Sequence, residues 1–399
     1  MKPMSPWQFT LFRILFGLYL AFHFVELTPY ATELFSASGL LKDPTLNPTA
    51  GLFPNPLALD LPGWAVTGSV AMLAGCALLF AAGLKRNWMA VILWFGWSAL
   101  FHRNNLISNP SIPYIGLLLL LSLLIPGGEP LNFGSRNASW AMPKWVFRAA
   151  WILLAAGYTF SGYTKLFSPS WVDGTAMSYL LQNPLARPGL ARDLMIALPD
   201  PLLKVLTWGT LAAELTFAPL AFWRTARPWL WLALVSMHLG IVLVVNFTDL
   251  TVGMLMIHAF TFDPEWLRAK GGLRVMAYDG DCLMCSKAVR FFAREDRQDV
   301  IRFATLQSEH GRRLAAQSGN SGLQTMLVEW NQRLFARSDA ALVLLEALGG
   351  IWAVAAFIGR LVPRRLRDSI YTFVAQRRHQ WFRNDACTLV PVEVTSRLL

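Results

Sequence analysis

The spacing of apolar residues changes near residue 264 of the chain. Before that point long apolar stretches alternate with short polar segments, and several approach the roughly 20 residues that cross a bilayer as a helix. After it the apolar runs are short and separated by charged residues, a pattern typical of a compact domain of strands and helices. We therefore expect a multi-pass α-helical membrane bundle followed by a C-terminal α/β domain. The apolar stretches occupy residues 9–27, 64–84, 88–107, 112–125, 145–163, 202–223, 229–245 and 247–260.

These stretches predict about eight membrane spans. The stretches at 112–125 and 247–260 are short and suit tilted or re-entrant segments. The first stretch contains ionisable residues and lacks a small-residue cleavage site, so we expect it to be retained as a helix. In an eight-span arrangement the basic loop residues gather on one side, which predicts that both termini are cytoplasmic. The expected location is the inner (cell) membrane.

The composition supports this division. With 55% hydrophobic and 15% charged residues, an entirely soluble protein is excluded. The formal net charge is +11, and most of the basic excess follows residue 264. Basic amphipathic stretches at 351–381 favour the cytoplasmic surface of the bilayer, although a solvated charged face is the alternative. No nucleic-acid-binding motif accompanies the charge, so we expect no nucleic acid partner.

Ionisable residues at membrane depth are energetically costly and mark buried polar sites. Glu214 and His238 lie deep within apolar stretches and are candidates for ligand binding. The alternative for His238 is a simple hydrogen-bonded contact between helices. Arg103 and Lys165 lie near predicted helix ends, where long side chains can also extend to the lipid headgroups.

One set of motifs in residues 5–266 resembles the HTTM family, the membrane domain shared with vitamin K-dependent gamma-carboxylase. We accordingly assign residues 1–266 to an HTTM-like membrane domain. The motifs are Ser5 to Arg13 before an apolar helix, Ser161-Gly162-Tyr163-Thr164-Lys165-Leu166 with Trp171 and Gly174, and His238 followed by Phe247, Met254 and Asp263-Pro264-Glu265-Trp266.

This resemblance implies that Lys165 is the base that deprotonates a reduced quinone or vitamin K-like lipid. A desolvated lysine amine can serve as a base near neutral pH. Trp171, Glu214 and His238 would then line the ligand pocket. The large lumenal domain that docks the protein substrate of the carboxylase is missing, so we carry over the pocket and the quinone-type ligand but not protein glutamate carboxylation.

The C-terminal part places two cysteines at the start of a predicted helix. The pattern predicts a strand at residues 273–278, a turn at Asp279-Gly280 and a helix at residues 283–293. Cys282 then lies at the helix start and Cys285 one turn further on, the order of a thioredoxin-like redox site. Further strands are expected at 300–304, 325–329 and 334–336, and further helices at 308–317 and 338–348.

This placement suits dithiol chemistry. The amide groups at a helix N-terminus stabilise a Cys282 thiolate, and Cys285 on the same face can resolve a mixed disulfide. Asp279 and Asp281 disfavour a second negative charge, or one of them shuttles a proton. Zinc binding is the alternative, but a closed zinc site needs about four ligands and no second close pair is present, so we expect no metal.

Residues 272–392 also resemble the DCC family of thiol-disulfide oxidoreductases. This second resemblance implies a thioredoxin-like fold and a reaction of Cys282 and Cys285 with a thiol or disulfide of a protein or small molecule. The motifs are Tyr278-Asp279-Gly280-Asp281-Cys282-Leu283-Met284-Cys285, Arg337-Ser338-Asp339-Ala340-Ala341-Leu342, Pro363, and Trp381-Phe382-Arg383 with Cys387.

Two functions remain open from the sequence. The first is a membrane-bound thiol-disulfide oxidoreductase coupled to a quinone-like ligand in the bundle. The second is a carboxylase-like or other lipid-modifying or quinone-dependent enzyme centred on Lys165, with the cysteine domain as accessory reductant. A transporter or scaffold that binds through His238 and Glu214 ranks last, because no inverted repeat is evident.

Overall fold

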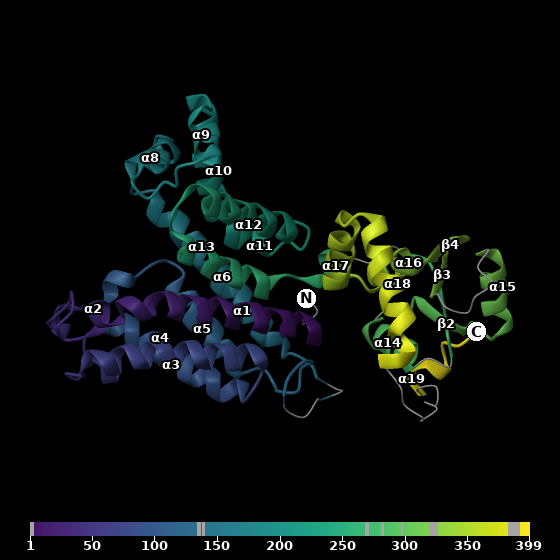
Figure 1. Cartoon of the computed structure of the whole chain (residues 1–399). Coiled ribbons are helices and arrows are strands. Elements are labelled where there is room, and N and C mark those ends of the chain that lie inside the picture. Colours follow the sequence, from purple (N-terminus) through teal and green to yellow (C-terminus); the bar gives the residue numbers. More distant parts are fainter. Residues whose placement is uncertain are drawn as a thin grey trace. The chain divides into compact units, whose positions relative to one another are not determined.

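The chain folds into two compact units, Met1–Asp263 and Pro264–Leu399. The structure is a computed structural model, and Figure 1 traces the chain through both units. It describes residues 4–133, 137, 140–267, 271–280, 283–296, 298–318, 326–381 and 392–399.

The first unit is largely helical. Helices α1, α3 and α4 pack side by side, as Figure 1 shows, and α13 packs against α1, α5, α6 and α12. Its helices are α1 (Pro6–Leu27), α2 (Ala31–Phe35), α3 (Gly63–Ala82), α4 (Arg86–Arg103), α5 (Ile112–Leu123), α6 (Lys144–Lys165), α7 (Pro169–Val172), α8 (Ala176–Gln182), α9 (Leu190–Ile196), α10 (Asp200–Leu215), α11 (Phe217–Ala221), α12 (Arg227–Val244) and α13 (Thr248–Thr261).

The prediction of about eight spans is wrong. Among the described residues, three segments are long and apolar enough to cross a membrane: Pro6–Phe35, Gly63–Ala82 and Arg227–Val244. A fourth is present if α9 and α10, which meet at 108°, form one broken span. The largely helical unit therefore holds three to four apolar helices that are compatible with membrane insertion.

Helix length and charge explain the lower count. Helix α5 has 12 residues and α13 has 14, so they reach about 18 and 21 Å at 1.5 Å per residue, against a hydrocarbon core of about 30 Å. Helix α4 has arginines at both ends, and α6 carries three basic residues. The pattern of apolar residues predicted where helices form, but not how many of them are long and apolar enough to span.

Buried arginines hold the first unit together. Glu129 lies between Arg13 and Arg86, with its Oε1 3.1 Å from Arg13 Nη1 and 3.2 Å from Arg86 Nε, and all three side chains are at most 2% exposed. Arg103 is also buried, and donates to three backbone carbonyl groups instead of reaching the surface. The interpretation of Arg103 as a headgroup contact is therefore wrong.

The second unit is a mixed α/β domain built on a four-stranded sheet. The strands are β1 (Arg274–Tyr278), β2 (Ile301–Thr305), β3 (Leu327–Trp330) and β4 (Arg333–Ala336), in the spatial order β2-β1-β3-β4. Strand β1 is parallel to β2 and antiparallel to β3, and β3 is antiparallel to β4. The helices are α14 (Leu283–Glu295), α15 (Glu309–Gln317), α16 (Arg337–Leu348), α17 (Gly350–Leu361), α18 (Arg364–Trp381) and α19 (Val392–Thr395).

Side chains along β1 alternate between the two faces of the sheet, and a hydrophobic core lies on each face. Met276 and Tyr278 contribute to the larger core, which includes residues from α14, α16 and α19. Val275 and Ala277 contribute to the smaller core, which includes Leu314 of α15. The expected strands and helices of this domain therefore form, with ends shifted by at most two residues.

Candidate functional site

The junction between β1 and α14 carries the first candidate site. Tyr278 closes β1 and is buried, and its carbonyl oxygen accepts a hydrogen bond from the backbone N–H of Leu306 at 2.8 Å. Asp279 and Gly280 follow as the expected turn, and α14 begins at Leu283. The chain thus passes from a buried strand to a helix start within four residues.

Cys285 is the third residue of α14, in the first helical turn. Its side chain is half-buried and packs against the core that contains Tyr278. Burial raises the pKa of the Tyr278 hydroxyl, and negative charge on Cys285 raises it further. Cys282 and Asp281, which the sequence predicted as part of this site, lie outside the described residues.

Gln307 connects the turn to the segment after β2. Its Oε1 accepts a hydrogen bond from the Gly280 backbone N–H at 3.3 Å, and its Nε2 donates to Asp279 Oδ1 at 3.3 Å. The turn before the cysteines thus continues directly from β1 and is attached by hydrogen bonds to the segment that follows β2. This contact attaches the side chain of Asp279, the first residue of the expected turn, to the segment after β2.

The first unit brings together three of the four residues predicted for the bundle. Lys165 Nζ, at the end of α6, lies 2.7 Å from Glu214 Oε2 near the end of α10, and also donates to Ser161 Oγ at 2.7 Å. The Trp171 ring lies 5.0 Å from the same nitrogen. The lysine side chain is 21% exposed and that of Glu214 5%, so the ion pair is mostly removed from solvent.

A glycine permits this contact. A Cβ atom at Gly162 would lie 2.8 Å from the backbone nitrogen of Leu215, closer than packed atoms allow. Helices α6 and α10 therefore approach closely one turn before Lys165 and beside Glu214, and any larger residue would push them apart.

His238 belongs to a different group. Its Nε2 lies 2.7 Å from the Tyr158 hydroxyl, which also lies 2.7 Å from Nε2 of His258. A hydroxyl has one proton, so it can donate to only one of these rings and accepts from the other. All three side chains are buried, and neither Nδ1 has a hydrogen-bond partner among the described residues. His238 and Lys165 thus share one bundle but make no hydrogen bond with each other in the part of the chain that the structure describes.

Tyr158 was not among the residues predicted from the sequence. A signal was present, since Tyr158, Ser161 and Lys165 recur at i, i+3 and i+7 in an otherwise apolar segment and therefore share one helix face. A polar stripe of this kind on a membrane helix faces the bundle interior. The spacing alone could not predict which residues of neighbouring helices contact Tyr158.

A cysteine in the first turn of the helix that follows a central strand of a mixed sheet defines the second unit as an α/β domain suited to thiol chemistry. Residues 276–384 match the family model of the DCC1-like thiol-disulfide oxidoreductases. Together with the relatives described next, this match shows that the chain belongs to the DCC1-like thiol-disulfide oxidoreductase family. The family match covers none of the helical unit.

Two relatives support the assignment. The uncharacterized protein YuxK of Bacillus subtilis is 31% identical over 129 residues, which are 32% of this chain and 93% of YuxK. The chloroplastic DCC family protein At1g52590 of Arabidopsis thaliana is 33% identical over 118 residues, 29% of this chain and 69% of that protein. No solved structure matches the chain significantly.

Proposed function

We propose that the protein is a membrane-bound thiol-disulfide oxidoreductase whose Cys282 and Cys285 alternate between dithiol and disulfide. The observation that carries this proposal is the position of Cys285 in the first turn of α14, directly after β1. The strand order β2-β1-β3-β4, with β3 antiparallel to its neighbours, is that expected of a thioredoxin-like domain. The family match supports the same chemistry.

In the proposed reaction a Cys282 thiolate attacks a substrate disulfide and releases one substrate thiol. Cys285 then attacks the mixed disulfide and releases the second thiol, leaving the Cys282–Cys285 disulfide. Two electrons and two protons pass to the substrate, and a cellular thiol restores the dithiol. The N-terminus of α14 favours this sequence because its backbone N–H groups and dipole stabilise a thiolate.

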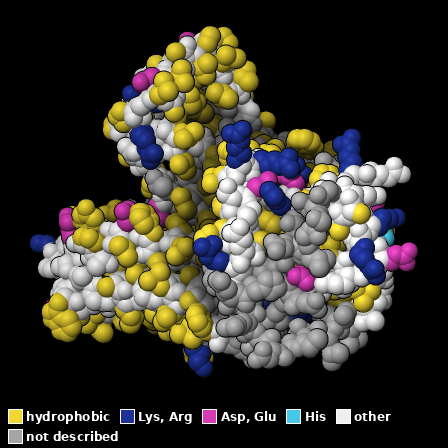
Figure 2. Space-filling view, turned by 45° about the vertical axis from the view of Figure 1, so that its right-hand side comes forward, with side chains coloured by type: hydrophobic (Ala, Val, Ile, Leu, Met, Phe, Trp, Pro, Cys, Tyr) yellow, Lys and Arg dark blue, Asp and Glu magenta, His cyan; other side chains and the backbone are white. Residues whose placement is uncertain are grey.

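The membrane location rests on the first unit. Its apolar helices expose many large hydrophobic side chains, among them Phe22, Trp64 and Phe160, and Figure 2 shows such side chains spread over its visible outer face. The basic excess that follows residue 264 favours a cytoplasmic second unit, in which the cysteines would rest reduced. Helices α17 and α18 expose apolar side chains beside arginines, which suits contact with an anionic inner leaflet.

A reductase assay on the full chain in lipid nanodiscs tests the thiol reaction. Dithiothreitol serves as electron source and a dye-labelled glutathione disulfide as substrate. We expect the wild type to accelerate reduction, Cys282→Ser to fall to background, and Cys285→Ser to accumulate a mixed disulfide. Cys76→Ser, which alters a cysteine of α3, is the matched control and should retain full activity. Equal rates in wild type and Cys282→Ser would overturn the proposal.

The Lys165 cluster supports a second element of the proposal, a quinone or vitamin K-like lipid in the helical unit. Lys165 is a hydrogen-bond donor to Glu214 and Ser161, and the Trp171 ring lies beside it, so a ligand carbonyl and its ring would find a cation and an aromatic surface together. The resemblance of residues 5–266 to the HTTM family favours the same ligand. The alternative function for this cluster is that of a carboxylase-like or other lipid-modifying enzyme in which Lys165 is the base.

Coupling would oxidise the dithiol to the disulfide and reduce the quinone to the hydroquinone, a balanced exchange of two electrons and two protons. The tether between the units supplies a high effective concentration for it. Quinone absorbance is followed after addition of a reduced thiol donor, in wild type, Cys282→Ser and Lys165→Ala. Equal rates in wild type and Cys282→Ser would remove the coupling. If Lys165→Ala abolishes turnover of a hydroquinone with carbon dioxide and with dioxygen as the oxidant, while Cys282→Ser only slows it, the carboxylase-like alternative is favoured.

A further inference from the structure

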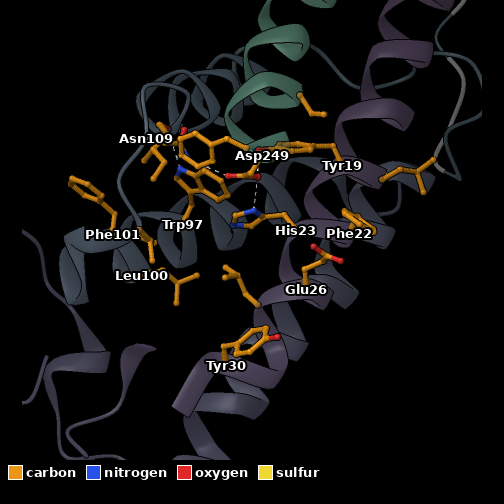
Figure 3. A pocket seen from close by; sticks show the side chains of 16 residues that line it. Tyr19, Phe22, His23, Glu26, Tyr30, Trp97, Leu100, Phe101, Asn109 and Asp249 are labelled. Carbon is orange, nitrogen blue, oxygen red and sulfur yellow. Dashed lines mark hydrogen bonds and ion pairs between the residues drawn. The ribbon is translucent and has the colours of Figure 1, made fainter. Parts of the chain in front are cut away.

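A cavity of about 600 Å³ lies within the helical unit, and none of its described lining residues belongs to the Lys165 cluster. Figure 3 shows its walls, which come from α1, α4, α13 and the segment before α5. Its volume falls in the range of small-molecule sites. The lining includes Tyr19, His23, Glu26, Trp97, Asn109 and Asp249.

Asp249 is the polar centre of this cavity. Its Oδ1 lies 2.8 Å from His23 Nδ1 and accepts a hydrogen bond from the Tyr19 hydroxyl at 2.9 Å. Its Oδ2 accepts from Asn109 Nδ2 at 3.1 Å. These contacts come from separate segments of the chain and fix the carboxylate in the cavity wall, while its side chain remains 31% exposed.

A glycine lets this centre form. A Cβ atom at Gly253, one turn after Asp249 on α13, would lie 2.5 Å from Ser111 Oγ and 3.2 Å from the Tyr19 hydroxyl. Helix α13 therefore packs directly against α1 and the segment that carries Asn109. The carboxylate is held by packing as well as by its hydrogen bonds.

The described lining residues include more acidic than basic side chains. Two carboxylates, Asp249 and Glu26, are present, and none of the described lining residues is lysine or arginine. Tyr19 and Asn109 are neutral donors, so they orient Asp249 without cancelling its charge, and His23 offsets that charge only when its ring is protonated. With His23 protonated, the lining still holds one carboxylate in excess, and an apolar cavity with excess negative charge is complementary to a cation.

The aromatic side chains of the lining also favour a cation. Six of the lining residues are aromatic, and Trp97 lies against His23 with ring centroids 4.8 Å apart. The faces of tryptophan and tyrosine rings attract cations, and carboxylates with such rings are the features that recognise ammonium groups. Figure 3 shows Glu26 and Tyr30 on the α1 side of the cavity, and both side chains are exposed, so charge also lies where a ligand would enter.

From this arrangement we infer that the cavity between α1, α4 and α13 binds a lipophilic organic cation, with its charge near Asp249 and Glu26 and its apolar body against the aromatic side chains. Nothing in the proposed thiol reaction uses these residues, so the inference stands apart from it.

Binding of two probes of the same shape and opposite charge tests this inference. The full chain in nanodiscs is equilibrated with tetraphenylphosphonium or with tetraphenylborate, and partitioning into empty nanodiscs is subtracted. We expect saturable binding of the phosphonium cation only. No saturable binding of the cation, or equal binding of the borate anion, would overturn the inference.

Variants of the two lining carboxylates test whether the cation binds in this cavity. Asp249→Asn should weaken cation binding about tenfold or more, and Glu26→Gln about threefold. Glu26 is exposed, so Glu26→Gln gives a reading even where Asp249→Asn impairs folding, which a thermal unfolding scan detects. Glu33→Gln alters an exposed carboxylate of α2 outside the lining and is the matched control. Unchanged affinity in Glu26→Gln together with a folded Asp249→Asn that binds as wild type would contradict the site.

Discussion

The backbone N–H of Gly280 donates a hydrogen bond to Gln307 Oε1 at 3.3 Å, and the Gln307 side chain returns one to Asp279. These contacts connect the turn before the cysteines to the segment that follows β2. The turn that precedes α14 is therefore attached to a side chain that lies 27 residues beyond Gly280 in the chain.

Gln307→Ala should loosen the turn between β1 and α14. Both hydrogen bonds are long and exposed, so their loss should cost at most about 1 kcal/mol, or roughly fivefold in the local opening equilibrium. Hydrogen–deuterium exchange of the segment joining β1 to α14 measures this. Gln317→Ala, which alters an exposed glutamine at the end of α15, is the control, and equal exchange in both variants would contradict the role of Gln307.

The contact between α16 and α18 should depend on pH. Ser338 donates to Asp368 through its hydroxyl and through its backbone N–H, and the hydroxyl contact is the main cause that lowers the pKa of Asp368 below its ordinary value of 3.8. A carboxyl whose pKa is lower in the folded state stabilises the fold above its unfolded pKa, and that stabilisation is lost as the pH falls through the folded pKa.

Asp368→Asn should therefore increase hydrogen exchange in α16 and α18 near pH 7, and the difference from wild type should shrink below about pH 3.8. Ser338→Ala removes the main cause of the lowered pKa, so the wild-type transition should move to higher pH in that variant. A difference between wild type and Asp368→Asn that is the same at pH 7 and pH 3 would contradict this account.

The ion pair of Lys165 and Glu214 should behave as one unit. Lys165→Met leaves a carboxylate that is 5% exposed without its cation, which should cost about 2 to 4 kcal/mol and lower the melting temperature by several degrees. The double variant with Glu214→Gln should recover part of the loss. Lys144→Met, at an exposed lysine that begins α6, is the control. Additive losses in the double variant would show that the two side chains are not coupled.

Local patterns predicted the second unit well. The run from Leu273 to Tyr278, the Asp279-Gly280 turn and the following periodicity predicted β1 and α14, because a strand, a turn and a helix each leave a short-range signal. The expected hairpin forms with Asn331 and Gln332 at positive φ in its turn. Its strands begin and end close to the predicted residues.

The helical unit was predicted less completely, for two physical reasons. Apolar stretches show where helices form, but α5 and α13 are packed inside the unit and are too short to span. Glu214, Trp171 and Lys165 were each predicted as site residues, yet the contact between Glu214 and Lys165 joins residues 49 positions apart and depends on the close approach at Gly162. Asp249 likewise gains its partners only through tertiary packing.

The most direct test of the account is the redox state of Cys282 and Cys285. The full chain is equilibrated in dithiothreitol redox buffers, and the remaining thiols are counted after alkylation with a mass-tagged maleimide. We predict one transition in which two thiols disappear together, unchanged in Cys76→Ser and absent in Cys282→Ser and Cys285→Ser. A wild type that keeps every thiol under oxidising buffers, or a transition that survives Cys285→Ser, would contradict the central claim.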